Sequence, residues 1–328
     1  MKIGILDDYQ HCVQALNCYE ILDGHHVKIF TNSARGMGQL AIRLASFEAL
    51  ILIGGRTHFP KALLEKLPNL KLISQVGNAT GHIDMSTATA RGIAIAESVV
   101  DPVAPAELTW ALIMAATRKI PQYASNLKNG TWQTVALSSA HNSLGIALKN
   151  RTLGIWGYGK IGRLVAAYGK AFGMQVVVWG RKASRAAAVA DGLHAAASQE
   201  SFFSDCDVVS LHLRLNDATR GIVTSADLAR MKMTALFVNT SNAELVARDA
   251  LLPALQQGRP GFAALDVFDT EPLPPDSPLL RMPNVLATPH IGFVETDSYE
   301  MLFHVAFLNI IDFAGKNPRN ILNPEVLQ

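Results

Sequence analysis

Three glycines in the middle of the chain have a spacing that could bind a dinucleotide. They lie in GIWGYGKIGRL, where an apolar strand (TLGIW) leads into a segment with helical spacing and then a second strand (MQVVVW). Glycines in this context allow a tight turn and a close approach of the backbone to pyrophosphate at a helix N-terminus. The alternative is a purely structural α/β turn. The predicted dinucleotide-binding residues are Gly157, Tyr158, Gly159, Lys160, Ile161 and Gly162.

The residues after the second strand indicate which nucleotide would bind. Sites that prefer NAD usually carry an aspartate or glutamate there, which accepts hydrogen bonds from the ribose hydroxyls. Here the position is Gly180, followed by Arg181, Lys182, Ser184 and Arg185. Guanidinium groups suit a 2′-phosphate in both charge and geometry. We therefore expect NADP(H), with NAD(H) as the alternative cofactor and an ordinary solvated basic loop as the alternative interpretation.

The elements around this turn indicate an α/β protein. Apolar runs alternate with helix-length segments along all 328 residues, a length that suits two domains of roughly 150 residues. This alternation predicts doubly wound parallel sheets. The runs read as strands are KIGILDD, HHVKIF, ALILIGG, LKLISQVG, RTLGIWGYG, MQVVVWG, CDVVSLHL, TALFVNT, GFAALDVF and NVLATPH.

One predicted helix, residues 104–120, is apolar almost all the way round. We expect it to begin near Pro105, to be ended by Pro121 and to be buried on most faces. It could be a core helix between domains, or it could also pack against a second subunit.

Composition excludes several classes of protein. The formal net charge is +2 and no run of Lys and Arg forms a stripe, so neither nucleic acid nor a membrane surface is expected as a partner. The longest nearly apolar run, at 108–116, is too short to span a bilayer. Three cysteines without metal-ligand spacing fit a reducing compartment, and we expect a cytoplasmic protein without a metal site.

Taken together, the motifs resemble the D-isomer-specific 2-hydroxyacid dehydrogenases, near their phosphoglycerate-dehydrogenase-like branch. The resemblance rests on the glycine motif with its helix, SLHLRLNDATRGIV, LFVNTS, ALDVFDTEPLP and NVLATPHIG, in this order along the whole chain. It implies two Rossmann-like domains of the formate/glycerate dehydrogenase type, with the nucleotide domain inserted in the substrate domain. A flavodoxin-like substrate domain would comprise 1–100 and 292–328, and an NAD(P)-binding domain 101–291. The resemblance also implies a homodimer built partly around the helix at 104–120.

The resemblance implies roles for two residues in acid–base chemistry. His290, in TPHIG, matches the general acid/base that exchanges a proton with the substrate oxygen as hydride moves. Glu271, in DTEP, matches the carboxylate that hydrogen-bonds the imidazole and orients it.

Further residues match positions that line the cofactor cleft. Asp266 matches a residue near the nicotinamide carboxamide, or is a strand-end carboxylate that accepts backbone N–H groups. His212 faces the cofactor or is a hydrogen-bonded core histidine. The motifs also imply cofactor contacts at Asn239, Thr240 and Gly292.

On the substrate side, the loop in SQVGNATGHID resembles one whose backbone N–H groups receive the substrate carboxylate. The matching positions are Val76, Gly77 and Asn78, and a simple strand-to-helix turn is the alternative. Arg56, in GGRTHF, would reach the same cleft or would be an exposed loop arginine.

The stretch FVNTSNAELV departs from the family pattern. Relatives usually carry an arginine that binds the substrate carboxylate where this chain has Asn242. Losing such a donor costs about 10²–10³ in rate. We therefore expect an NAD(P)-dependent oxidoreductase of a 2-oxo/2-hydroxy acid with weakened or altered chemistry. The alternatives are a reductase of a carbonyl compound without a carboxylate, and a catalytically degenerate protein that binds nucleotide or metabolite.

Overall fold

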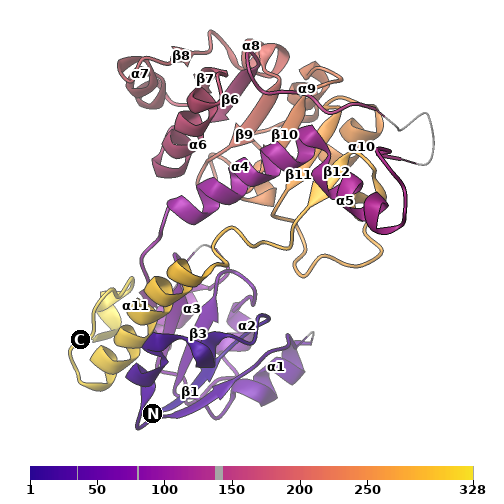
Figure 1. Ribbon diagram of the computed structural model, residues 1–328. Coiled ribbons are helices and arrows are strands. Elements are labelled where there is room, and N and C mark those ends of the chain that lie inside the picture. The colour runs from indigo at the N-terminus through magenta and orange to yellow at the C-terminus, as the bar shows by residue number, and fades with distance from the viewer. Residues whose placement is uncertain (35, 80, 137–142, 328) are drawn as a thin grey trace. The chain divides into compact units, whose positions relative to one another are not determined.

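The chain divides into two compact α/β units, each built around its own parallel sheet (Figure 1). The computed structural model describes residues 1–34, 36–79, 81–136 and 143–327. Unit 1 comprises Met1–Asp101 and Val294–Gln328, and unit 2 comprises Pro102–Phe293. The second unit is therefore inserted in the sequence of the first. The expected fold class, two doubly wound parallel sheets with one unit nested in the other, is confirmed.

Unit 1 contains a five-stranded sheet in the order β2-β1-β3-β4-β5, with every neighbouring pair parallel. β3 and β4 are buried at every position, which explains why they read as continuous apolar runs. The strands are β1 (Lys2–Ile5), β2 (His26–Ile29), β3 (Ala49–Ile53), β4 (Leu72–Val76) and β5 (Ala94–Glu97).

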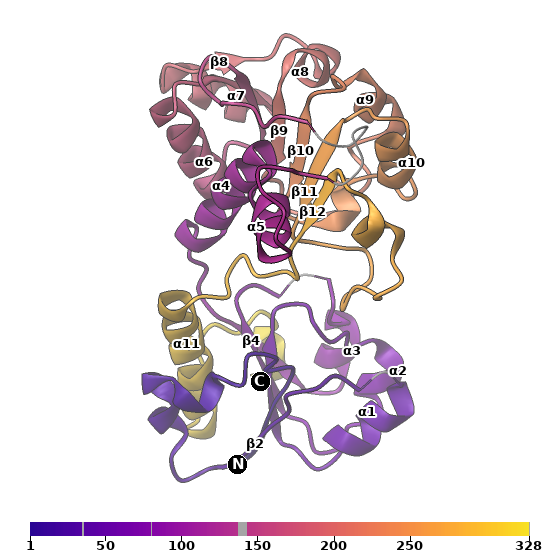
Figure 2. The same cartoon turned by 45° about the vertical axis from the view of Figure 1, so that its right-hand side comes forward.

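Helices cover both faces of this sheet (Figure 2). Three helices share one apolar cluster with Leu50, Leu52 and Ile73. The C-terminal helix packs on the other face, where Ser74 Oγ donates a hydrogen bond to the carbonyl oxygen of Ala306 at 2.9 Å. The α-helices are α1 (Met37–Leu44), α2 (Lys61–Leu64), α3 (Met85–Ala90) and α11 (Thr296–Ala314), and the 3-10 helices are η1 (Val13–Ala15), η2 (Asn17–Leu22) and η5 (Pro324–Leu327).

Unit 2 contains a seven-stranded parallel sheet in the order β12-β11-β10-β9-β6-β7-β8. The strands are β6 (Thr152–Trp156), β7 (Gln175–Trp179), β8 (His194–Ala195), β9 (Val208–Leu211), β10 (Leu236–Asn239), β11 (Phe262–Leu265) and β12 (Val285–Ala287). The α-helices are α4 (Val103–Arg118), α5 (Ile120–Lys128), α6 (Lys160–Ala171), α7 (Lys182–Ala190), α8 (Gln199–Asp205), α9 (Ser225–Arg230) and α10 (Leu251–Gln256). The 3-10 helices are η3 (Ala243–Leu245) and η4 (Pro278–Arg281).

The expectation that Pro121 ends the long apolar helix is wrong. α4 ends at Arg118, and the chain turns at Lys119, whose φ of 55° is left-handed. A second helix, α5, then begins at Ile120 with Pro121 in its first turn, where the missing N–H costs nothing. α4 packs against α6, β10 and β11. Among the residues that the structure describes, no helix is both long and apolar enough to cross a membrane.

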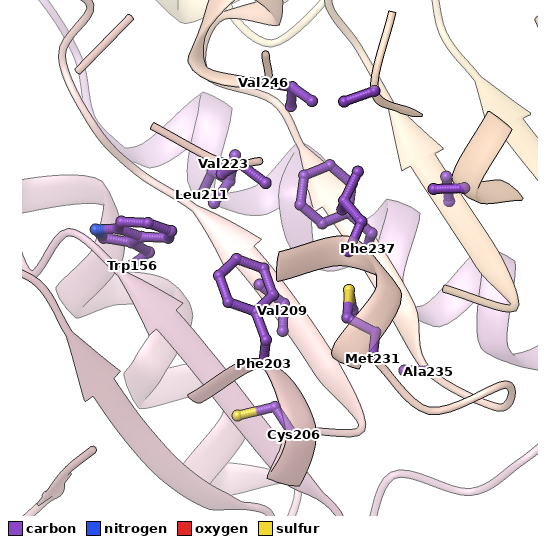
Figure 3. Packing of buried hydrophobic residues seen from close by; sticks show 14 of the residues in the cluster. Trp156, Phe203, Cys206, Val209, Leu211, Val223, Met231, Ala235, Phe237 and Val246 are labelled. Atoms are coloured by element: carbon purple, nitrogen blue, oxygen red, sulfur yellow. The ribbon is translucent and has the colours of Figure 1, made fainter. Parts of the chain in front are cut away.

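Aromatic packing holds the end of β6 in unit 2 (Figure 3). The ring of Trp156 meets those of Phe202 and Phe203 edge to face, with centroids 6.0 and 5.7 Å apart. These side chains are almost fully buried, and such pairs contribute about 0.5–1.5 kcal/mol beyond the area they bury. Because Trp156 is the last residue of β6, this packing fixes the point where the glycine turn begins.

Candidate active site

The predicted site residues of unit 2 follow the carboxyl ends of its parallel strands. The order of the strands reverses between β6 and β9, which is where ligands bind to open sheets of this kind. The residues after strand ends are Gly157 after β6, Gly180 after β7, His212 after β9, Asn242 after β10, Asp266 after β11 and His290 after β12. The topology therefore brings these residues to one edge of the sheet.

The glycine turn fits a bound pyrophosphate. Gly157 has a φ of 101°, and a Cβ there would lie 2.3 Å from the carbonyl oxygen of His212. A Cβ at Gly162 would lie 2.1 Å from the carbonyl oxygen of Gly157. Both positions therefore require glycine. Gly159 caps α6 without a side-chain hydrogen bond and has open space where its Cβ would be, so the first amides of the helix can face an anion.

Basic residues surround the end of β7, and the ribose-binding carboxylate is absent from this turn. Gly180 has a φ of 141°, which disfavours any other residue. Arg181 precedes α7, whose first turn contains no acidic residue. The guanidinium of Arg185 lies 4.8 Å from the centre of the Trp179 ring, which holds that charge beside the turn.

The other predicted residues of the turn contribute differently. The side chain of Tyr158 is directed to Asp191, to which its hydroxyl donates at 2.8 Å. Only its backbone therefore belongs to the turn. Lys160 and Lys182 are exposed, whereas Ile161 is half-buried.

His290 and Glu271 form a hydrogen-bonded pair. Nδ1 of His290 lies 2.6 Å from Oε2 of Glu271, and the second carboxylate oxygen accepts the backbone N–H of Phe268 at 2.9 Å. Their side chains are 39% and 25% exposed, so the pair is reachable from solvent. The His290 backbone has a φ of 53°, a left-handed conformation that is uncommon outside functional sites and turns. The geometry fits an imidazole oriented by a carboxylate, with Nε2 as its proton-exchanging atom.

The side chain of Asp266 anchors the loop that carries His290 through hydrogen bonds. Its carboxylate is fully buried and accepts the backbone N–H groups of Ile291 and Gly292, both at 2.9 Å, and the hydroxyl of Thr288 at 2.7 Å. Burial raises the pKa of Asp266, and these donors and the nearby His290 partly offset that effect. The contacts match the alternative in which this residue is a strand-end carboxylate that binds backbone amides.

His212 is held as a neutral side chain. Its ring nitrogen Nε2 lies 2.9 Å from the hydroxyl of the buried Ser210, and its backbone N–H donates to Trp156 at 2.8 Å. Burial lowers the pKa of His212 to about 4. The ring is therefore uncharged at neutral pH, and the backbone carbonyl of His212 lies close to Gly157.

The loop after β10 is shaped by its own side chains. The amide of Asn239 donates to the carbonyl oxygen of Asn242 at 2.8 Å, and its Oδ1 accepts the N–H of Ser241 at 3.1 Å. The Thr240 hydroxyl lies 2.6 Å from that of Thr109 on α4. Asn242 is half-buried and begins η3, with its side chain bonded to no group among the residues that the structure describes. This loop is therefore ordered but carries no charge at position 242.

The substrate-side residues all belong to unit 1. Val76 ends β4, and Gly77 follows with a φ of 83° and a carbonyl that accepts the N–H of Ser98 at 3.0 Å. Asn78 is half-buried. Arg56, after β3, is also half-buried and is held by the segment that follows β1, so it is not an exposed loop arginine.

Three residues that contact or surround Arg56 were missed at the level of sequence. They are Asp7, Tyr9 and Tyr299. The motif LDDYQ could have indicated the first two, because it follows a strand at the point where a flavodoxin-like sheet reverses its order.

Comparison with known proteins agrees with this geometry. Residues 110–292 match the NAD binding domain of the D-isomer specific 2-hydroxyacid dehydrogenases. A glyoxylate reductase of Aeropyrum pernix is 36% identical over 81% of this chain and 80% of its own length. A glyoxylate/hydroxypyruvate reductase B of Yersinia enterocolitica is 31% identical over 90% of both chains.

Solved structures give the same assignment. A phosphoglycerate oxidoreductase from Vibrio cholerae is 51% identical, with a TM-score of 0.92 over 96% of this chain and 99% of that chain. A structure from Ralstonia solanacearum, described provisionally as a D-3-phosphoglycerate dehydrogenase, is 53% identical, with a TM-score of 0.96 over 100% of this chain and 98% of that chain. The chain therefore belongs to the D-isomer-specific 2-hydroxyacid dehydrogenases and is an oxidoreductase that uses a nicotinamide cofactor.

Proposed function

We propose that this chain is an NADP(H)-dependent oxidoreductase that interconverts a small 2-oxo acid and its D-2-hydroxy acid, with His290 as the acid/base. The observation that carries the proposal is the 2.6 Å hydrogen bond between His290 and Glu271 at the carboxyl edge of the unit 2 sheet. A degenerate site does not need this pair, whereas general acid–base catalysis needs an oriented side chain that can exchange a proton with the carbonyl oxygen.

In the proposed reaction, a bound nicotinamide would supply the hydride chemistry, and a side chain of the protein donates or accepts the proton. Glu271 binds Nδ1 of His290, so Nε2 is the atom that gives a proton to the carbonyl oxygen in reduction and removes it from the hydroxyl in oxidation. Asp266 keeps this histidine in place through the amides that follow it. The proposed cofactor contacts are the glycine turn, Arg181 and the loop after β10.

The cofactor preference is proposed from the charges at the end of β7. Gly180 offers no carboxylate to the ribose, and Arg181 and Arg185 favour a 2′-phosphate. Titration with NADPH and NADH should show tighter binding of NADPH, and Arg181→Ala should weaken NADPH binding selectively. Arg230→Ala, which removes an exposed arginine of α9, is the matched control. Tighter NADH binding that is insensitive to Arg181→Ala would refute the preference.

The substrate class is proposed from the relatives, which are named as reductases of glyoxylate and hydroxypyruvate and as phosphoglycerate dehydrogenases. The uncharged Asn242 favours a second candidate, a carbonyl compound without a carboxylate. Initial rates with NADPH for glyoxylate, hydroxypyruvate and a neutral ketone of similar size separate the two. Turnover of the ketone alone would overturn the acid substrate.

We also propose a homodimer. α4 presents Glu107 and Ala111 to solvent, and the segment after it exposes the apolar side chains of Ile120, Leu127 and Trp132 to 52%, 56% and 74%. Apolar side chains gathered in this way on one segment are typical of a surface that a second subunit covers.

A further inference from the structure

A cavity lies at the amino-terminal edge of the unit 2 sheet, away from the strand ends that carry the predicted catalytic residues. Its volume of about 660 Å³ is in the range of small-molecule sites. Phe262 and Val285, the first residues of β11 and β12, line it together with the turn between α4 and α5, which lies beside these strands (Figure 2). Asp266 follows the opposite end of β11, about 13 Å away at a rise of about 3.3 Å per residue. The cavity is therefore separate from the edge that carries His290.

Lys119, in that turn, is the only charged residue that lines the cavity among the residues that the structure describes. It is 8% exposed. Its ammonium donates a hydrogen bond to the Ser143 hydroxyl and lies 5.4 Å from the centre of the Phe262 ring. Within the described part of the chain it forms no ion pair, and the sequence at 137–142 includes no Asp or Glu. The chain thus buries a cation without an anion to balance it.

An unbalanced cation in this place destabilises the fold unless a ligand compensates it. Burial penalises the charged form and lowers the pKa of Lys119. A hydroxyl and the face of a ring offset only part of the lost hydration, since neither carries a charge. A carboxylate at hydrogen-bonding distance from Nζ would supply the missing negative charge and favour the protonated lysine. The lysine therefore indicates an anionic ligand, and a single cation indicates a single negative charge.

The rest of the wall indicates the remainder of the ligand. Gln122 lines the same cavity, and its Oε1 atom is buried without a hydrogen-bond partner among the described residues. An unsatisfied buried acceptor fits an O–H or N–H group of a ligand. Most other lining residues are apolar, among them Leu255, Phe262, Met282 and Leu286. This wall favours a ligand with an apolar body.

We propose that this cavity is a binding site for a small monocarboxylate that has an apolar body and one O–H or N–H donor. The carboxylate binds Nζ of Lys119, the donor binds Oε1 of Gln122, and the apolar body packs on the ring of Phe262. The ligand stays chemically unchanged, because no other titratable side chain lines the cavity in the described part of the chain. The site is independent of the proposed dehydrogenase activity, and its ligand need be neither a 2-oxo nor a 2-hydroxy acid.

The test uses 4-hydroxyphenylacetate, an acid of this kind that a dehydrogenase of 2-hydroxy acids cannot turn over, and calorimetry on the full chain. Two reference probes each lack one group: 2-(4-hydroxyphenyl)ethanol has no carboxylate, and phenylacetate has no hydroxyl. Loss of the charge-assisted contact should weaken binding of the alcohol about 10- to 100-fold, and loss of the neutral hydrogen bond should weaken binding of phenylacetate about two- to tenfold. These comparisons use the wild-type protein, so they do not depend on the folding of a variant.

A variant then assigns the effect to the lysine. Lys119→Met keeps the apolar part of the side chain and removes its charge, so it should reduce the affinity for the acid about 10- to 100-fold and leave that for the alcohol unchanged. Lys128→Met, at the exposed end of α5, is the matched control and should bind the acid like the wild type. Because the cation is unbalanced without a ligand, the thermal midpoint of ligand-free Lys119→Met should equal or exceed that of the wild type.

The outcomes separate this site from the catalytic edge and from a subunit contact. Equal affinity of wild type and Lys119→Met for the acid, or no detectable binding to the wild type, would refute the site. Displacement of the acid by oxamate, an unreactive analogue of a 2-oxo acid, would assign the acid to the substrate site instead. A lower thermal midpoint, or a change from dimer to monomer in Lys119→Met, would assign the lysine to the fold or to contact with a second copy. Binding that persists in saturating oxamate supports the site, whether or not the protein reduces 2-oxo acids.

Discussion

The exchange of Glu271 for glutamine tests the acid–base pair most sharply. The carboxylate uses one oxygen for Nδ1 of His290 at 2.6 Å and the other for the Phe268 N–H at 2.9 Å. Glutamine has one acceptor oxygen and one NH2 group, so Glu271→Gln cannot satisfy both donors. It also removes the negative charge that stabilises the imidazolium. Hydrogen bonds to charged groups contribute about 1.5–3 kcal/mol, which predicts a roughly 10- to 100-fold loss of kcat/KM.

The assay is the initial rate of NADPH oxidation with glyoxylate or hydroxypyruvate in a double-mutant cycle. His290→Gln alone should reduce the rate further, and Glu271→Gln should cost little more once His290 is gone, because the two residues act as a unit. Unchanged NADPH affinity in each variant serves as the control for folding. A Glu271→Gln loss of equal size in both backgrounds would refute the idea that Glu271 acts through His290.

Three further predictions follow from buried groups and from the exposed segment after α4. The pKa of His212 falls from 6.5 to about 4 on burial, so the unfolded chain binds this proton at higher pH than the folded chain. The free energy of unfolding should therefore decrease by up to about 1.4 kcal/mol per pH unit as the pH falls from 6.5 to about 4. Urea denaturation of His212→Gln should show this slope removed. An equal slope in the variant and the wild type would contradict the prediction. Asp266→Asn should lower kcat and destabilise the protein by about 1–3 kcal/mol, since one loop amide loses its acceptor, and a thermal melt with wild-type midpoint would contradict this. Light scattering at micromolar concentration should give about twice the chain mass of 35.4 kDa, whereas a monomer would mean that no second subunit covers Trp132.

Most strands were predictable because burial in a parallel sheet demands continuous apolar runs. β3 (ALILI) and β9 (VVSL) are buried at every position and can be recognised by composition alone. β5 (AIAE) was not predicted, because it is short and alanine-rich. β8 has only two residues, both exposed, and its sequence contains no strand pattern. Lys119 shows the same limit in a helix, since α4 ends at Arg118, two residues before the end at 120 that the sequence predicted.

The candidate site was predictable where local sequence determines it. The glycine turn needs only its neighbours, since the Cβ clashes at Gly157 and Gly162 arise within one strand–turn–helix unit and the adjacent strand end. The anchoring of Ile291 and Gly292 by Asp266 joins segments on different strands, and it could be suggested from sequence only as an alternative. The roles assigned to individual residues, Asn242 among them, stay predictions until the variants are measured.

The hydrogen bonds of Asp266 act on the segment through which the chain leaves unit 2. The chain leaves unit 2 at Phe293/Val294, directly after the loop that carries His290. Asp266 fixes the amides of Ile291 and Gly292, which lie between the histidine and this crossing. Asp266 therefore anchors the backbone between His290 and the crossing to the end of β11, on the same loop whose histidine pairs with Glu271.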